Sequence, residues 1–258
     1  MPKKDIVEEA KRILELAEQQ AIILRLFGGV AVRFQCPSAT YRKLQRDYAD
    51  IDLIGLKKQS GEIKSLVREL GYDSREVFNA FQGDRRLIFN DLENERRLDI
   101  FLDNFEMCHR LKLKERLILS KTTISLADLL ATKLQVVELT EREYKDVIAL
   151  VHDHEIIGLD QTEAINGSYL ANLAADDWGM YKTFSMNIAN ILAALPRFEL
   201  DQADQKIVHK RLDDLQARFE ETPKTMRWKL RALIGEKVRW YELPEPDREI
   251  VDSRINKT

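Results

Sequence analysis

A glycine pair that follows a short apolar run is the feature that most constrains how this chain folds. The run from Ala21 to Phe27 ends in Gly28-Gly29, and the small apolar residues Val30 and Ala31 come next. This pattern predicts a buried strand, a tight turn and the start of a helix. Glycines let backbone N–H groups approach an anion closely, and a helix N-terminus adds positive potential. The pair therefore predicts a phosphate-binding turn.

A pair of acids opens the next apolar run. Asp50-Ile51-Asp52 begins the run that ends at Leu56, and side chains alternate along a strand, so Asp50 and Asp52 share one face. Their Cα atoms then lie roughly 6.6–7 Å apart, which lets both carboxylates bind one metal centre. Arg46, four residues before Asp50, places a cation near the same point. A phosphate turn followed by paired carboxylates indicates a metal-bound nucleoside triphosphate (NTP).

Composition limits the class of protein. The chain has 258 residues, of which 44% are hydrophobic and 33% charged, as in ordinary soluble proteins of one large or two small domains. No apolar run spans a bilayer and the N-terminus lacks a signal core, so we expect a cytoplasmic protein with no membrane partner. Two cysteines without metal-ligand spacing argue against a zinc site. A net charge of −3 argues against a broadly basic nucleic-acid surface, but a local one stays open.

The N-terminal part alternates between helical and strand patterns. Apolar spacing predicts helices over residues 5–19 and 61–70, the second ended by Gly71. Short apolar runs between turn residues predict strands at 21–27, 51–56, 77–81, 86–90 and 97–102, the last three as antiparallel hairpins. This part is expected to form a mixed sheet with flanking helices.

One acid interrupts the last of these runs. Asp99 lies among apolar residues, and an ionised aspartate is seldom buried without a partner. It either lies at a mouth of the sheet or shares a cation with Asp50 and Asp52. We favour the shared cation, because a third carboxylate completes a magnesium site.

The remainder of the chain has helical periodicity. Residues 122–139 predict a helix capped at Ser125, with Lys133 near the centre of its apolar stripe. A lysine there requires either a partner or a route to water for its ammonium group. Thr140 begins a capping box and a further helix, on which Asp146 taken alone would be a surface charge.

These patterns predict an α+β fold, in which a mixed-sheet core with flanking helices is followed by a C-terminal helical bundle. We expect an α/β core over residues 1–110, a helical domain over 111–245 and a loose tail over 246–258.

The order of these motifs resembles the DNA polymerase β-like nucleotidyltransferase superfamily over about residues 21–102. The superfamily pattern is an aliphatic residue, Gly-Gly or Gly-Ser, then Asp-x-Asp or Asp-x-Glu, then a third carboxylate. Here these are Gly28-Gly29, Asp50-Ile51-Asp52 and Asp99. The resemblance implies a nucleotidyltransferase fold for the N-terminal core.

Within this superfamily, the chain looks most similar to the AbiEii/AbiGii toxin-type nucleotidyltransferases. The double glycine with Arg46, the helical Lys133 and the run from Arg142 to Lys145-Asp146 match motifs of that branch. The branch usually has another acid a few residues later, where this chain has Ala149, with Asp153 as the next candidate.

The resemblance implies transfer of a nucleoside monophosphate (NMP) from an NTP to an acceptor hydroxyl. The implied catalytic and metal-binding residues, for two Mg²⁺ ions with Mn²⁺ as the alternative, are Asp50, Asp52 and Asp99, the last also as base. The implied nucleotide-binding residues are Gly28, Gly29, Arg46, Lys133 and Asp146. An RNA acceptor such as a tRNA 3′ end and a cognate antitoxin partner are implied by the toxin branch. The alternatives are an antibiotic, other small-molecule or protein nucleotidyltransferase, and a catalytically inactive nucleotide-binding module.

Overall fold

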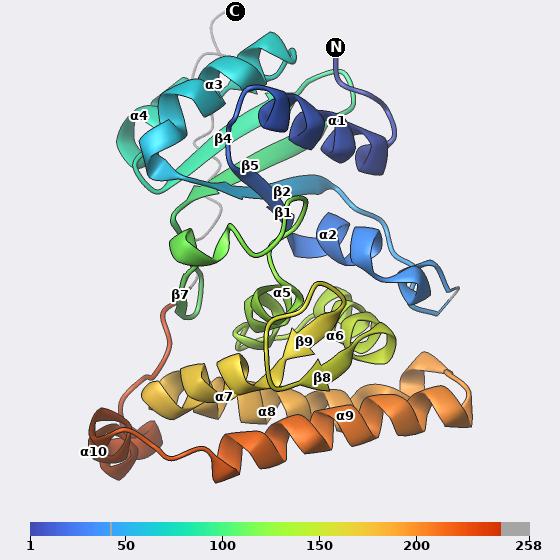
Figure 1. Cartoon of the computed structure of the whole chain (residues 1–258), viewed down its shortest axis with the longest axis vertical. Helices are drawn as coiled ribbons and strands as arrows, with labels where there is room; N and C mark the ends of the chain where they lie inside the picture. Colours follow the sequence, from blue (N-terminus) through green and yellow to red (C-terminus); the bar gives the residue numbers. More distant parts are fainter. Residues whose placement is uncertain (42, 244–258) are drawn as a thin grey trace, which may run out of the picture.

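The structure, a computed structural model, describes residues 1–41 and 43–243, so the tail predicted at 246–258 lies outside the described residues. A sheet with its covering helices forms one end of the molecule, and stacked helices form the other (Figure 1). The predicted fold class is confirmed: a mixed sheet is followed by a helical region.

The main sheet places two distant strands side by side. Its strands are β1 (Leu24–Phe27), β2 (Asp50–Gly55), β3 (Asp73–Ser74), β4 (Arg86–Asp91) and β5 (Arg96–Leu102). Their order is β1-β2-β5-β4-β3, and β2 and β5 run parallel while the other neighbours are antiparallel. In this register Asp52 lies directly opposite Asp99.

One face of the sheet is apolar. Ile51 and Leu53 of β2 and Leu98 and Ile100 of β5 are fully buried. In Figure 1, α1 (Ile6–Gln19) and α3 (Ser60–Glu69) lie on one side of the sheet and α2 (Gly28–Gln35) lies on the other. Because strand side chains alternate, burial of these four residues leaves the acids on the opposite face.

The other elements are mostly helical. They are α4 (Glu76–Gln82), α5 (Leu126–Leu134), α6 (Glu141–Asp153), α7 (Gly167–Asp176), α8 (Trp178–Ala194), α9 (Gln202–Glu221) and α10 (Met226–Ile234). Short strand pairs are β6 (Asn104–Glu106) with β7 (Arg110–Lys112), and β8 (Glu155–Ile157) with β9 (Ala164–Asn166). Single 3-10 turns are Pro37–Thr40, Lys57–Gln59, Lys114–Arg116, Leu195–Phe198 and Gly235–Lys237. Within the described residues, no helix combines the length and apolar composition that crossing a bilayer requires.

The sheet and the helical region are joined by backbone hydrogen bonds. The Leu26 N–H donates to the Thr122 carbonyl at 2.8 Å, and the Ile124 N–H donates to the Leu26 carbonyl at 3.0 Å. One hydrophobic cluster extends from the sheet into the helices. The β6–β7 pair spans residue 110. The division into domains at that residue stays a prediction.

Most predicted local signals are present. Asp5 caps α1, Ser125 caps α5, and Thr140 forms a capping box with Glu143 at the start of α6. Gly71 follows α3 with a φ of +91°, the left-handed conformation expected of a helix-ending glycine. Helix starts and ends are therefore determined here by nearby residues.

The strand predicted at 77–81 is wrong, because these residues belong to helix α4. Val77 and Phe81 face outward, with 54% and 81% of their surface exposed, whereas the polar Asn79 is buried. The Asn79 side chain accepts from the Ile88 N–H at 2.8 Å and donates to the Ile88 carbonyl at 2.9 Å. These side-chain hydrogen bonds attach α4 to β4 and bury the polar side of the helix. The apolar residues of the segment therefore did not indicate its buried side.

We predict that Ala21→Gly stabilises the protein. Ala21 lies two residues after the end of α1 and has a φ of +56°, a left-handed conformation that costs a non-glycine residue about 1–2 kcal/mol. After the entropy cost of glycine, the free energy of unfolding in urea should rise by about 0.5 kcal/mol. Ala17→Gly, buried inside α1, is the matched control and should lower it by about 1 kcal/mol or more. A loss of stability in Ala21→Gly would contradict the assigned strain.

Candidate active site

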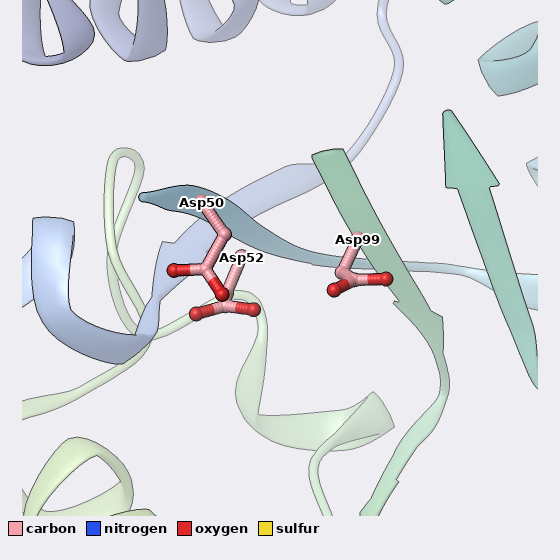
Figure 2. Close-up of side chains that lie close together, drawn as sticks. All are labelled: Asp50, Asp52 and Asp99. Atoms are coloured by element: carbon pink, nitrogen blue, oxygen red, sulfur yellow. The ribbon is translucent and has the colours of Figure 1, made fainter. Parts of the chain in front are cut away.

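Three carboxylates converge on the polar face of the sheet. Asp50 and Asp52 extend from β2 and Asp99 from β5, all toward the same space (Figure 2). One carboxylate oxygen from each residue lies within 4.8 Å of those of the other two. The parallel register causes this, since Asp52 and Asp99 are direct cross-strand partners.

The glycine pair lies directly beneath functional side chains. Gly28 has a φ of +70°, and a Cβ atom there would overlap the Asp52 carboxylate. A Cβ atom on Gly29 would overlap the Arg46 guanidinium. Close approach and backbone conformation thus require glycine at Gly28, whereas a side chain at Gly29 would have to displace the Arg46 guanidinium. Within the described residues, no side chain caps the first turn of α2, so its N–H groups are available to an anion.

The negative charges of the three carboxylates repel one another. The pKa of Asp52 is raised to about 8, first because its carboxyl is withdrawn from water and then because Asp50 and Asp99 are negative. Lys133 and Arg86 oppose that rise. A divalent cation would relieve this repulsion, and carboxylate oxygens are the donors that Mg²⁺ and Mn²⁺ prefer. The residues present therefore fit such an ion.

Asp99 already contacts two cations of the protein. Arg86 lies 3.2 Å (Nε) from Asp99 Oδ1 and 3.0 Å (Nη2) from Oδ2, and Arg97 Nε lies 2.7 Å from Oδ2. Asp99 is fully buried in the middle of β5, so its predicted alternative position at a mouth of the sheet is wrong. Sequence reasoning missed both arginines. Alternation along β5 places Arg97 on the face of Asp99 and was the available signal.

A second charged cluster supports the phosphate side. Arg46 donates to both oxygens of Asp146, at 2.9 and 2.8 Å, and Lys133 Nζ lies 2.7 Å from Asp146 Oδ2. The interpretation of Asp146 as a surface charge is wrong, because it is 3% exposed and pairs with two cations. Asp146 is also the partner that the lysine in an apolar stripe required. The cluster keeps one net positive charge.

These groups surround one cavity of about 680 Å³. Seven of the eight predicted site residues line it: Gly28, Gly29, Arg46, Asp50, Asp52, Asp99 and Lys133. Asp146 is not among the lining residues and holds Arg46 and Lys133 from behind. Other parts of the wall are aromatic, acidic or basic and include Phe78, Phe101, Phe105, Glu138, Glu143, Glu242, Lys57, Arg85, Arg110 and Arg142.

Of the remaining residues of the toxin-type motif, one lines the cavity and the others make contacts elsewhere in the fold. Arg142 lines the cavity, whereas Lys145 pairs with Glu141 at 2.9 Å. Ala149 is buried. Asp153, the other candidate acid, accepts the Ser38 N–H at 2.9 Å and so attaches the turn Pro37–Thr40 to α6.

The similarities of this chain to known proteins are to solved structures. No protein-family model and no curated protein matches the chain. Among solved structures, the lincomycin-bound lincosamide antibiotic adenylyltransferase LnuA is 18% identical over 55% of this chain and 94% of its own, with a TM-score of 0.39.

The antibiotic-resistance factor ANT(2'')-Ia is also among the similar structures. Its solution structure is 16% identical over 66% of this chain and 93% of its own, with a TM-score of 0.40. Its complex with adenylyl-2''-tobramycin is 16% identical over 56% and 86%, with a TM-score of 0.38.

We predict opposite effects for two Gly→Ala substitutions. Gly28→Ala should lower the free energy of unfolding by about 2 kcal/mol or more, because the new methyl group displaces the Asp52 carboxylate and the backbone is left-handed. Gly61→Ala, in helix α3 with open space around its Cβ position, should raise it by about 0.5–1 kcal/mol. Urea unfolding measures both, and equal effects would contradict close approach at Gly28.

Asp52→Asn should stabilise the metal-free protein increasingly with pH. The folded state raises the pKa of Asp52 from its ordinary value of 3.8 to about 8, so the native state holds this proton more tightly. Wild-type stability then falls as pH rises from about 4 to about 8, and asparagine removes the penalty. The Tm gain of the variant in a chelator should be larger at pH 9 than at pH 5.5, by roughly 5 °C. A gain that does not change with pH would refute the charge crowding.

Proposed function

We propose that this chain is a metal-dependent nucleotidyltransferase that moves an NMP from an NTP to an acceptor hydroxyl. The observation that carries the proposal is a cluster of three carboxylates, with oxygens within 4.8 Å of one another, one of which (Asp52) lies against Gly28 at the uncapped start of α2. Arg46 and Lys133 line the same cavity. Basic side chains that neutralise the phosphates, beside carboxylates that can bind a metal ion, are the groups that phosphoryl transfer requires.

The phosphate side of the proposed site is positioned before any ligand binds. The backbone N–H groups of Gly28 and Gly29 would donate to the β- and γ-phosphates. Asp146 holds Arg46 and Lys133 by three contacts of 2.7–2.9 Å. Fixed positive charge costs little reorganisation when negative charge develops on the leaving pyrophosphate.

The carboxylates would hold Mg²⁺ or Mn²⁺. When bound, such ions polarise the transferred phosphoryl group and lower the pKa of the acceptor hydroxyl. Asp99 would take the hydroxyl proton as the acceptor oxygen forms its bond to the α-phosphorus. The bond from that phosphorus to the bridging oxygen breaks, and pyrophosphate leaves with the bonding electrons.

For the acceptor, we propose a cationic small molecule that binds the part of the wall where aromatic and acidic side chains lie together. Phe78, Phe101 and Phe105 offer apolar surface beside Glu138 and Glu242. Within the described part of the chain, no lysine or arginine forms an ion pair with either glutamate. The net charge of −3 also suits a cationic ligand better than RNA.

The toxin hypothesis, with an RNA acceptor and an antitoxin partner, differs from this proposal only in the acceptor. Its support is the resemblance of Lys133 and the Arg142–Asp146 run to the toxin branch, which stays a hypothesis. An inactive nucleotide-binding module would bind NTP with Mg²⁺ but transfer nothing to any acceptor.

The test is label transfer from each α-labelled NTP in the presence of Mg²⁺. Acceptors are aminoglycoside and lincosamide antibiotics, total cellular RNA and total protein. Asp52→Ala should lower transfer by at least about a thousandfold, because it removes a group that contacts the reacting centre. Circular dichroism checks that the variant is folded.

Asp73→Ala is the matched control. Asp73 is exposed on β3 of the same sheet and does not line the cavity, so its transfer rate should stay within about twofold of wild type. Near-normal transfer by Asp52→Ala would refute the mechanism. Label on RNA alone would replace the small-molecule acceptor with the toxin-type one.

A further inference from the structure

Both oxygens of Asp99 are already engaged by the protein. Arg86 spans them with its Nε and Nη2 atoms, at 3.2 and 3.0 Å, and Arg97 Nε lies 2.7 Å from Oδ2. Asp50 and Asp52 have no such contact with a guanidinium group among the described residues. A metal ion that used Asp99 would compete with these arginines for the same oxygens.

The acid and its arginines differ in freedom to move. Asp99 is fully buried and lies in the middle of β5 between β2 and β4. The side chains of Arg86 and Arg97 are 24% and 29% exposed and line the cavity. Arg86 also rests on the Phe101 ring, 4.8 Å from its centre. A change of partner would therefore move the guanidinium and leave the carboxylate in place.

We infer that Arg86 is a displaceable counter-ion that blocks a metal site at Asp99 until nucleotide binds. The guanidinium then exchanges Asp99 for a phosphate of the nucleotide. Arg97 stays on Asp99 Oδ2, and Oδ1, which Arg86 contacts, becomes free to bind a metal ion. This inference rests on the proposed function, because the incoming phosphate is that of the NTP.

The exchange follows from charge and shape. A guanidinium and a divalent cation repel each other when they share one carboxylate, so the second ion binds weakly while Arg86 stays. A planar guanidinium fork fits phosphate as well as carboxylate, and the triphosphate brings more negative charge than Asp99 alone. Arg86 would thus be a positioning residue for Asp99 and a contact for the substrate.

The inference predicts metal stoichiometry, which Mn²⁺ titration followed by electron paramagnetic resonance measures directly. Wild type should bind one Mn²⁺ per chain without nucleotide, at Asp50 and Asp52, and a second one in the presence of a non-hydrolysable NTP analogue. Arg86→Gln should bind the second Mn²⁺ without nucleotide, with a Kd at least about tenfold lower than that of wild type. The same variant should bind the analogue about tenfold more weakly at saturating Mn²⁺.

Arg85→Gln is the matched control. Arg85 is the preceding residue, carries the same charge and lines the same cavity, but its side chain is 71% exposed and lies 4.0 Å from Glu106 rather than Asp99. Its Mn²⁺ binding should equal that of wild type. Arg86→Lys keeps the charge without the fork, is the second variant if Arg86→Gln does not fold, and should give an intermediate Kd.

Two outcomes would overturn the inference. One is equal Mn²⁺ binding by Arg86→Gln and Arg85→Gln, and the other is a second tight Mn²⁺ in wild type without nucleotide. Neither outcome concerns label transfer, so the proposed function survives both. If no NTP analogue binds to wild type, the proposed function fails together with the exchange, even where Arg86→Gln gains the second ion.

Discussion

The parallel pairing of β2 with β5 is the constraint on which the site depends. It sets Asp52 directly opposite Asp99, and like charges in that position destabilise a sheet. The fold tolerates them because Arg86 and Arg97 contact Asp99 and because the Asp52 carboxyl lies above a glycine at the start of α2. The strand register therefore brings these negative charges together before any ligand is present. A cation that bound between them would relieve their repulsion.

A second ionic cluster attaches the helices to this sheet. Arg46 precedes β2, and its partner Asp146 lies 100 residues later in α6, beside Lys133 of α5. A lone buried acid would be strongly destabilising, but two cations compensate this one. The cluster positions α5 and α6 relative to the glycine turn. The helical region therefore contributes charge to the cavity as well as covering for the sheet.

Local sequence signals predicted what local physics determines. The glycine turn, the Asp50–Asp52 alternation and the helix caps depend on residues within a few positions, and the structure has all of them. Contacts between separate elements were not visible: the pair of Arg46 with Asp146, 100 residues apart, and the contact of Arg86 on β4 with Asp99 on β5. Arg97, two residues before Asp99, is the exception, because alternation along β5 indicates it. The wrong strand at 77–81 has the same origin, because the side-chain hydrogen bonds of Asn79 to β4, and not hydrophobic periodicity, decide which side of α4 is buried.

The contact between Gly29 and Arg46 has a consequence for how such a chain can evolve. A side chain at position 29 and a guanidinium from position 46 would occupy the same volume. The two positions are therefore coupled: glycine is needed at 29 as long as a long basic side chain comes from 46. If residue 46 became a shorter side chain, a larger residue could replace Gly29. We therefore expect substitutions at positions 29 and 46 to occur together.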